Sequence, residues 1–204
     1  MNPLPDPAIL AITDRRQCGE PLEARAAALF SAGCRFLSLR EKDLAVRDRF
    51  ALLGRLSALG RDYGATVCVH DDLPAAFACG TALHLPADGD VTKARDLLGP
   101  AALIGQSCHS RDEIIAAAAA GVDYVTLSPV FPSVSKPGYP TLAAIDIAGL
   151  GIPVLALGGI AFNTIARLPA GFAGVATMGQ AMVATDPAAW FRAIRTAWTA
   201  SRRA

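Results

Sequence analysis

The sequence has few aromatic residues and almost no excess of either charge. Aromatic residues make up 6% of the chain, and 19 basic residues nearly balance 18 acidic ones, which gives a formal net charge of +1. Surfaces that bind nucleic acid are usually basic and often carry stacking aromatic rings, and membrane-surface segments carry basic clusters. The composition therefore predicts neither a nucleic-acid partner nor a membrane partner.

The cysteine spacing, the first residues and the longest apolar run each bear on where we expect the protein to act. Its five cysteines are odd in number and no CxxC pair occurs, a pattern that favours free thiols in a reducing compartment. The start, MNPLPDP, has no basic segment followed by an apolar one. The apolar run 114–122 is far shorter than the ~20 residues needed to span a bilayer. We therefore expect a soluble, cytoplasmic protein.

Short apolar runs alternate with longer segments of helical period along the whole chain. The predicted strands are 8–13, 35–40, 65–70, 82–85, 101–105, 123–128, 153–157 and 174–178. The predicted helices are 21–32, 46–63, 73–79, 91–98, 111–120, 142–147, 162–168 and 187–200. Glycines stand where helices should end, at Gly33, Gly64, Gly80, Gly99 and Gly121.

Alternating strands and helices indicate parallel strands joined by helical crossovers. The pattern predicts a (β/α)8 barrel of near-minimal size that forms a single domain over residues 1–204. A doubly wound open sheet is the alternative, but it usually has a glycine-rich turn after its first strand. Here that strand ends in Thr13-Asp14-Arg15-Arg16. In a barrel, functional residues are expected just after each strand, at the C-terminal face.

Charged side chains follow the second and third predicted strands. Arg40 and Lys42 combine a planar fork with a point charge, which suits an anion, although a solvated charge cluster is the alternative. Asp72 and Pro74 fit the start of a helix, which leaves Asp71 without a structural task. A carboxylate near bound phosphate suggests Mg²⁺, and a surface carboxylate is the alternative.

The fifth predicted strand is followed by Ser107, Cys108, His109 and Ser110. Ser110 and Glu113 have the spacing of a capping box. Ser107 and His109 precede that helix, where backbone N–H groups favour anions, and His109 suits general acid–base work. A structural histidine is the alternative. Cys108 alternates away from its neighbours and is expected to be buried rather than nucleophilic.

Glycines and hydroxyl groups mark the last three strand ends. Gly158 and Gly159 follow the seventh strand, and Met178 and Gly179 follow the eighth, where barrels often bind phosphate; an ordinary tight turn is the alternative. After the sixth strand, residues 130–140 read VFPSVSKPGYP. We expect this loop to close over the barrel mouth, and a plain surface loop is the alternative.

Taken in order, these segments resemble the thiamine phosphate synthase and thiazole tautomerase family over nearly the whole chain. The resemblance rests on Ile12-Thr13-Asp14, Leu39-Arg40-Glu41-Lys42, His70-Asp71-Asp72, His84-Leu85, Ile104-Gly105-Gln106-Ser107-Cys108-His109-Ser110, Asp123-Tyr124-Val125, Pro129-Val130-Phe131-Pro132-Ser133-Val134-Ser135-Lys136 and Ala156-Leu157-Gly158-Gly159-Ile160. It implies a (β/α)8 barrel that couples a pyrimidine pyrophosphate with a thiazole phosphate and releases pyrophosphate with the assistance of Mg²⁺.

The resemblance also implies roles for individual residues. Pyrophosphate would be held by Arg40, Lys42, Ser107 and Lys136, and Mg²⁺ by Asp71. Ser133 and Ser135 match two hydroxyl positions of the family's loop. The thiazole phosphate would lie at Gly158, Gly159, Met178 and Gly179. Whether the chain forms a homo-oligomer stays open at this point.

The chain departs from the synthase pattern at several positions. Ser38 and His70 stand in the expected substrate site where synthases have Gln and Asn. The run after His84-Leu85 begins with Pro86 rather than Gly, and the second metal ligand of synthases is out of register, so that Asp88 or Asp90 would have to replace it.

These departures keep three alternatives open beside the synthase. The first is a thiazole tautomerase that needs no cofactor and uses His109 to move a proton. The second is Schiff-base chemistry at Lys136 or Lys42. The third is a barrel that binds a thiamine precursor without turnover.

Overall fold

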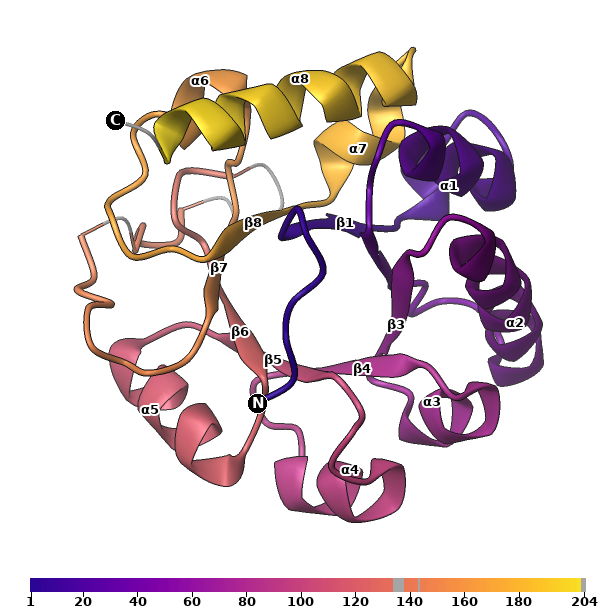
Figure 1. Ribbon diagram of the computed structural model, residues 1–204, viewed down its shortest axis with the longest axis horizontal. Helices are drawn as coiled ribbons and strands as arrows, with labels where there is room; N and C mark the ends of the chain where they lie inside the picture. Colours follow the sequence, from indigo (N-terminus) through magenta and orange to yellow (C-terminus); the bar gives the residue numbers. More distant parts are fainter. Residues whose placement is uncertain (134–137, 143, 203–204) are drawn as a thin grey trace.

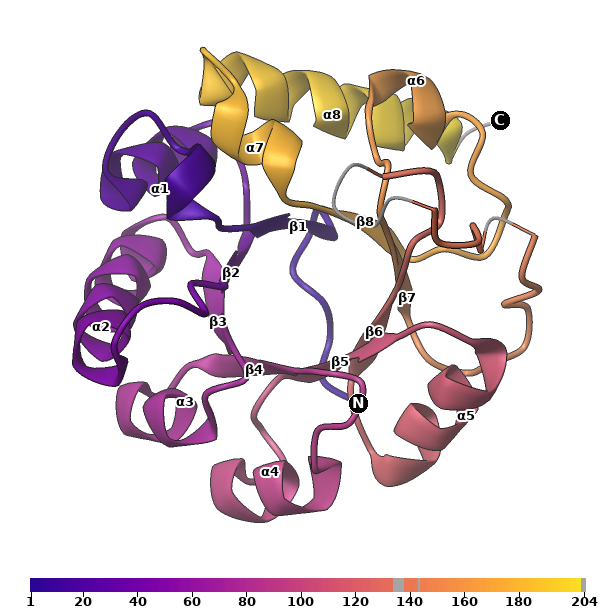
Figure 2. The ribbon, with the colours of Figure 1, turned by 180° about the vertical axis from the view of Figure 1, so that it is seen from behind.

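The computed structural model describes residues 1–133, 138–142 and 144–202. Eight strands form one closed parallel barrel in chain order, which confirms the predicted (β/α)8 fold (Figure 1, Figure 2). The strands are β1 (Ile9–Ile12), β2 (Phe36–Leu39), β3 (Thr66–His70), β4 (Ala82–Leu85), β5 (Ile104–Cys108), β6 (Tyr124–Leu127), β7 (Val154–Leu157) and β8 (Gly174–Thr177).

Helices surround the barrel in both views. They are α1 (Leu22–Ser31), α2 (Val46–Asp62), α3 (Leu73–Cys79), α4 (Val91–Leu98), α5 (Arg111–Ala120), α6 (Phe162–Ile165), α7 (Gly179–Val183) and α8 (Pro187–Ser201), with a short 3₁₀ helix η1 (Arg15–Gln17) after β1 (Figure 1). Within the described ranges, none of these helices is both long and apolar enough to cross a membrane.

The start and end of α3 and α5 agree with the sequence patterns. Asp72 accepts a hydrogen bond from the Ala75 N–H at the start of α3, and Ser110 accepts one from Glu113 N–H at the start of α5. Each helix ends at a glycine in the left-handed conformation. The Glu113 carboxylate, however, accepts from the backbone N–H of His109 rather than that of Ser110. Glu113 thus fixes the chain where β5 passes into α5.

The fifth strand was predicted three residues too early. Residues 101–105 were expected to form it, whereas β5 covers Ile104–Cys108. The chain turns after α4 at Gly99 and Pro100, and the apolar Ala101 and Ala102 belong to that turn. Gln106 and Ser107 consequently lie on the strand itself, and the loop begins only after Cys108.

The segment between β6 and β7 also differs from expectation. A helix at 142–147 was predicted, but the described residues on either side of 143 form turns and irregular chain. The Ile145 N–H donates to the Leu142 oxygen and the Ala148 N–H donates to the Asp146 carboxylate, so the chain turns here instead of continuing as a helix. Its buried Ile147 packs against the outer core instead. In addition, α6 ends three residues before the predicted 168, and α7 had not been predicted at all.

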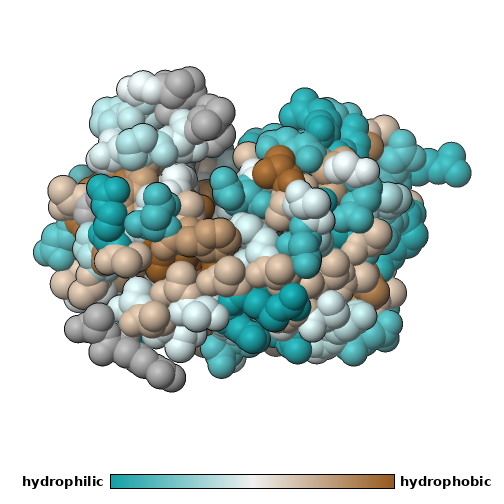
Figure 3. Space-filling model, turned by 90° about the horizontal axis from the view of Figure 1, so that it is seen from above, coloured by the Kyte–Doolittle hydropathy of each residue, from teal (hydrophilic) through white to brown (hydrophobic). Residues whose placement is uncertain are grey.

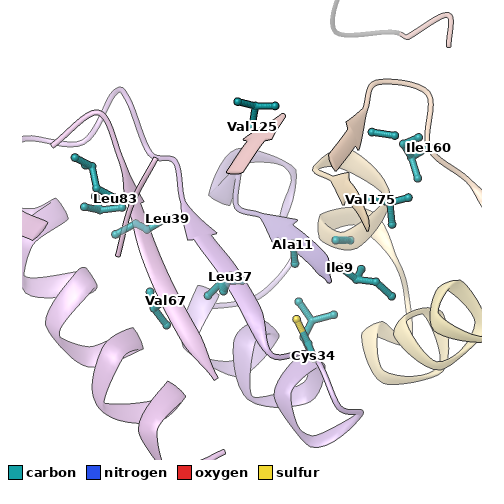
Figure 4. Packing of buried hydrophobic residues seen from close by; sticks show 14 of the residues in the cluster. Ile9, Ala11, Cys34, Leu37, Leu39, Val67, Leu83, Val125, Ile160 and Val175 are labelled. Carbon is teal, nitrogen blue, oxygen red and sulfur yellow. The ribbon is translucent and has the colours of Figure 1, made fainter. Parts of the chain in front are cut away.

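The outer core lies between the strands and the helices. Alternate strand residues such as Leu37, Leu39, Val67 and Val175 point outward into it (Figure 4). Cys108 is 1% exposed and belongs to this layer, as predicted. Burial raises the pKa of its thiol to about 12, so it is protonated and inert at neutral pH.

The inner core fills the barrel itself. It contains Leu10, Phe36, Tyr124 and Leu155, all fully buried. The Tyr124 ring occupies space left by Gly105 on the neighbouring strand, because a Cβ atom at Gly105 would lie 2.1 Å from the ring's Cζ atom. A single glycine therefore makes room for the largest side chain in the barrel.

The N-terminal segment crosses the barrel at the end where the strands begin (Figure 1). Asp123, just before β6, accepts hydrogen bonds from the backbone N–H of Asn2 (2.6 Å) and of Ile104 (2.8 Å), and pairs with Arg95 at 2.9 Å. Burial by itself would raise the pKa of Asp123, but these hydrogen bonds outweigh it and lower the pKa. Leu4 packs against the inner core above this anchor. This end of the barrel is thus closed, and the other end is left for ligands.

The contact between Gly105 and Tyr124 gives a direct test of inner packing. We expect Gly105→Ala to lower the free energy of unfolding by about 1–3 kcal/mol, because an added methyl group must displace a ring held by close packing. Gly54→Ala is the control, since no atom lies within 4 Å of its Cβ position on α2, and alanine there should stabilise the helix by up to about 1 kcal/mol. Equal effects of the two substitutions in urea denaturation would contradict the packing described.

Candidate active site

The C-terminal ends of the strands form a polar mouth. Figure 2 views the barrel from this side, and the upper edge of the molecule in Figure 3 is hollowed between two raised rims. Residues at or just after most strand ends lie on this side. Those named from the sequence are Ser38, Arg40, Lys42, His70, Asp71, Ser107, His109, Ser133, Gly158, Gly159, Met178 and Gly179.

Arg40 directly follows β2 and contacts residues that follow β1 and β8. Its backbone N–H donates to Thr13 Oγ1 at 2.9 Å, and its guanidinium Nη1 lies 3.8 Å from the sulfur of Met178, after β8. The intervening Glu41 is buried and accepts from the Arg15 backbone N–H at 3.0 Å. Arg15 also forms a two-pronged pair with Asp43 at 2.7 and 2.8 Å. Since these carboxylates are occupied by Arg15, Arg40 and the exposed Lys42 are left for an anion.

Two histidines lie side by side beneath these cations. His70 and His84 are partners in the β3–β4 register, with ring centroids 5.7 Å apart. Burial, the neighbouring His84 and the charges of Arg40 and Lys42 lower the pKa of His70 to about 3. Burial and Arg40 lower the pKa of His84 to about 4. Both imidazoles are therefore neutral at pH 7, and the charge of the mouth comes from the two basic side chains.

Ser107 is bonded to the interior of the barrel. Its Oγ lies 3.1 Å from Nε2 of His84, and Nδ1 of His84 lies 3.0 Å from the hydroxyl of Tyr124. Thr126 Oγ1 is 3.4 Å from the same Nε2. Ser38 lies in the same upper part of the barrel and is 2% exposed. Hydroxyl and imidazole groups thus satisfy one another's hydrogen bonds in a largely buried region.

His109 is exposed, and its tautomer follows from its partner. Its Nδ1 lies 2.7 Å from the backbone oxygen of Ser128 at the end of β6. A carbonyl oxygen can only accept, so Nδ1 carries the proton and Nε2 of the neutral ring has a free lone pair. The Glu113 carboxylate holds the His109 backbone N–H at 2.7 Å. His109 is therefore arranged to accept a proton at Nε2.

Asp71 stands apart from the other carboxylates. It is exposed and has a φ of 55°, the one positive value among described residues other than glycine. A backbone conformation of this kind costs energy and is concentrated at functional positions. The neighbouring Asp72 caps α3 and pairs with Arg49 at 2.6 Å, so it is not available to a ligand.

The protein offers a divalent cation one carboxylate at this position. In the part of the chain that the structure describes, no three histidine, cysteine, aspartate or glutamate side chains are grouped to hold a metal. Asp90 accepts from the Lys93 N–H at the start of α4. The amide of Gln106 donates to the backbone oxygens of Pro86, Ala87 and Gly89, which anchors the loop that carries the exposed Asp88. One carboxylate fits Mg²⁺ that arrives with substrate phosphates, since such ions keep several waters.

The two glycines after β7 are required by close packing. Gly158 and Gly159 have φ values of 92° and 64°, and Cβ atoms there would lie 2.8 Å from Pro129 Cα and 2.5 Å from the Pro132 oxygen. The Val130 N–H also donates to the Leu157 oxygen at 2.8 Å. Because these two residues have no side chains, the loop after β6 can pack closely against the end of β7. Met178 and Gly179 begin α7.

Two predicted ligands fall outside the described residues. Ser135 and Lys136 lie within the range 134–137, so the structure says nothing of their placement. Ser133 is described, half-buried, at the near end of that loop. The proposed closure of residues 130–140 over the mouth stays a prediction.

Three interior residues had not been assigned a role from the sequence. His84, Tyr124 and Thr126 are buried polar side chains on β4 and β6. Alternation along each strand would have placed them inside the barrel, because His84 has the same inward direction as Ala82, and Thr126 as Tyr124. Their hydrogen bonds, however, join different strands and follow only from the barrel's closed geometry.

The lowered pKa values of the buried histidines make the stability of the protein depend on pH. A histidine with a lowered folded pKa binds its proton only after unfolding, so stability is lost as pH falls below the ordinary value of 6.5 toward the folded value. For His84 this amounts to about 1–2 kcal/mol between pH 7 and pH 5. The loss of unfolding free energy over that interval should be smaller by this amount in His84→Gln. Equal losses in urea titrations of both proteins would refute the assignment.

Comparison with known proteins agrees with this geometry. Residues 9–181 match the family described as thiamine monophosphate synthase. The thiamine-phosphate synthase of Chromobacterium violaceum is 39% identical over 180 residues, covering 85% of this chain and 87% of that protein. That of Salinispora tropica is 38% identical over 192 residues, covering 87% and 90%.

A solved structure shows the same fold. The thiamine phosphate pyrophosphorylase from Pyrococcus furiosus has a TM-score of 0.81 at 24% identity and covers 95% of this chain and 96% of its own. The family match and the two relatives extend over most of this chain. We conclude that the chain belongs to the thiamine monophosphate synthase family.

Proposed function

We propose that this chain is a thiamine phosphate synthase, which joins hydroxymethylpyrimidine pyrophosphate to thiazole phosphate and releases pyrophosphate. The observation that carries the proposal is the placement of Arg40 at the mouth of this family member, where its backbone is fixed by Thr13 and its guanidinium extends to Met178 after β8. Burial and, after it, the charge of Arg40 lower the pKa of His84 beneath it. A cation that depresses this pKa acts in a region of low dielectric, where it would also bind a polyanion strongly.

In this proposal the cations stabilise the leaving group. Negative charge grows on the pyrophosphate as the carbon–oxygen bond breaks, and interactions that strengthen with that charge accelerate the step. Arg40 and Lys42 supply the fixed positive charge, and Ser107 supplies a hydroxyl at the end of β5. Lys136, Ser133 and Ser135 would add contacts from the loop after β6.

Asp71 would hold Mg²⁺ against the pyrophosphate. The ion, when bound, would neutralise phosphate charge as a Lewis acid. The exposed carboxylate on a positive-φ residue at the tip of β3 supports this role. Asp88 and Asp90 would bind it only if the anchored loop after β4 rearranged, so we propose Asp71 as the protein's direct ligand.

The thiazole phosphate would occupy the opposite side of the mouth. Backbone groups of Gly158, Gly159, Met178 and Gly179 lie at the ends of β7 and β8, where barrels often receive phosphate. Ser38 stands where synthases have Gln, and His70 stands where they have Asn. Both residues would line the space for the pyrimidine. With both rings bound, the thiazole nitrogen needs mainly positioning for attack.

We further propose a cytoplasmic location. The five cysteines, Cys18, Cys34, Cys68, Cys79 and Cys108, are free thiols, which suits a reducing compartment.

Lysine substitutions test the synthase proposal. With both substrates and Mg²⁺, we expect Lys42→Ala to lower kcat/KM for pyrophosphate release by about 10²-fold, because a charge that stabilises the transition state is lost. Lys136→Ala should have an effect of the same order. Arg61→Ala is the control, since it also removes one positive charge, but from an exposed residue in the last turn of α2, at the opposite end of the barrel. Wild-type protein that releases no pyrophosphate at any Mg²⁺ concentration would rule the proposal out.

Thiazole tautomerase is a second candidate, favoured by the arrangement of His109. Its Nδ1–H is bonded to Ser128, so Nε2 is ready to take a proton from a thiazole carboxylate phosphate without metal. If the protein catalyses this proton shift, His109→Asn should lower the rate by about 10²-fold or more, measured as deuterium exchange in metal-free buffer. An intact rate in the variant would exclude His109 as the base.

A further inference from the structure

A buried chain of hydrogen bonds leads from the barrel interior to the mouth. It runs from the Tyr124 hydroxyl to Nδ1 of His84 over 3.0 Å, and from Nε2 of His84 to Ser107 Oγ over 3.1 Å. The three residues belong to β6, β4 and β5. Tyr124 is 0% exposed and His84 is 4% exposed, so water does not compete for these bonds. Ser107, at the end nearest the solvent, is half-buried.

Packing keeps Tyr124 in place. Its ring fills the gap above Gly105 and meets the Phe36 ring edge-on at 5.4 Å. The His84 ring is held between Tyr124, at a centroid distance of 5.5 Å, and His70. The rings of Phe36, His84 and Tyr124 therefore cannot turn without disturbing the inner core.

The hydrogen bonds that join Tyr124, His84 and Ser107 can be oriented in two ways. Both ends are hydroxyl groups, each of which can donate or accept, and a neutral imidazole has one donor and one acceptor nitrogen. In one direction Tyr124 donates to Nδ1, Nε2–H donates to Ser107, and the Ser107 O–H points to the mouth. In the other, Ser107 donates to Nε2, Nδ1–H donates to Tyr124, and the mouth is offered only lone pairs.

An anion can bind to only one of these two arrangements. A phosphate oxygen accepts hydrogen bonds and repels lone pairs, so it stabilises the direction in which the Ser107 O–H is free. Arg40 directly follows β2, at the same end of the barrel as Ser107 near the end of β5, so its cation and the Ser107 hydroxyl can face one anion.

We propose that Tyr124 and His84 are positioning residues that turn Ser107 into a hydrogen-bond donor toward the leaving pyrophosphate. This inference rests on the proposed function, because it assigns the anion at the mouth to pyrophosphate. Tyr124 acts by donating to Nδ1 and thereby fixing the proton of His84 on Nε2. Thr126, whose Oγ1 lies 3.4 Å from that nitrogen, is a weaker second acceptor for it.

A double-mutant cycle separates this role from a general effect on folding. Inorganic pyrophosphate with Mg²⁺ is titrated by calorimetry into wild type, Tyr124→Phe, Ser107→Ala and the double variant. We expect Tyr124→Phe to weaken binding about threefold to tenfold in the wild-type background, and less than about 1.5-fold when Ser107 is already alanine. Equal losses in both backgrounds, or none in either, would overturn the proposal.

Tyr63→Phe is the matched control. It removes a tyrosine hydroxyl from the end of α2, outside the barrel, and should leave pyrophosphate affinity unchanged. Tyr124→Phe keeps the ring that fills the space at Gly105, and its folded fraction is checked by urea denaturation.

The tautomer of His84 gives a readout that needs no variant. In wild-type protein with labelled histidine, ¹⁵N spectra report which ring nitrogen carries the proton. With saturating pyrophosphate we expect the proton of His84 on Nε2, and a proton on Nδ1 would contradict the inference. If wild-type protein does not bind pyrophosphate at all, the proposed function fails. If wild-type protein binds pyrophosphate and Lys42→Ala weakens that binding, but Tyr124→Phe has no effect, the inference alone fails.

Discussion

The position of the Tyr124 ring against Gly105 determines how the interior of this barrel is divided. Below the tyrosine hydroxyl the interior is apolar, with Leu10, Phe36 and Leu155 in close contact. Above it the inward side chains include His84, Ser107 and Thr126, and burial requires their polar groups to find partners. His84 lies at the boundary and bonds upward to Ser107 as well as downward to Tyr124. The packed rings of Tyr124 and Phe36 thus lie directly beneath the polar mouth.

The charge of the mouth depends on the same division. Because the two histidines are buried beneath Arg40 and Lys42, they remain neutral and do not add positive charge. Acidic residues nearby are already engaged, with Glu41 and Asp43 paired to Arg15 and Asp72 paired to Arg49. The result is an excess of positive charge next to one exposed carboxylate, Asp71. This combination suits a pyrophosphate carried together with a divalent cation.

Much of this architecture could be predicted from the sequence, because period and punctuation are local. The caps at Asp72 and Ser110, and the bounds of α3, α4 and α5, follow from residues within a few positions of each other. The bounds of β5 and the helix expected at 142–147 were predicted wrongly, because turns near Gly99 and among the described residues after Pro140 compete with the apolar patterns.

The parts of the site that were missed depend on contacts across the barrel. The role of Gly158 and Gly159 as a seat for the loop after β6 requires knowing that the loop returns over β7. The bonds of His84 require three strands to be closed in register. No spacing in the sequence encodes either contact, although alternation along β4 does place His84 inside.

The most direct test of the central claim is a crystal structure of the protein with Mg²⁺ and pyrophosphate. We predict that pyrophosphate lies between Arg40, Lys42 and Ser107, with the metal bound to Asp71 and otherwise to phosphate oxygens and water. Pyrophosphate bound elsewhere on the barrel, or at the mouth without contact to Arg40 and Ser107, would contradict the account.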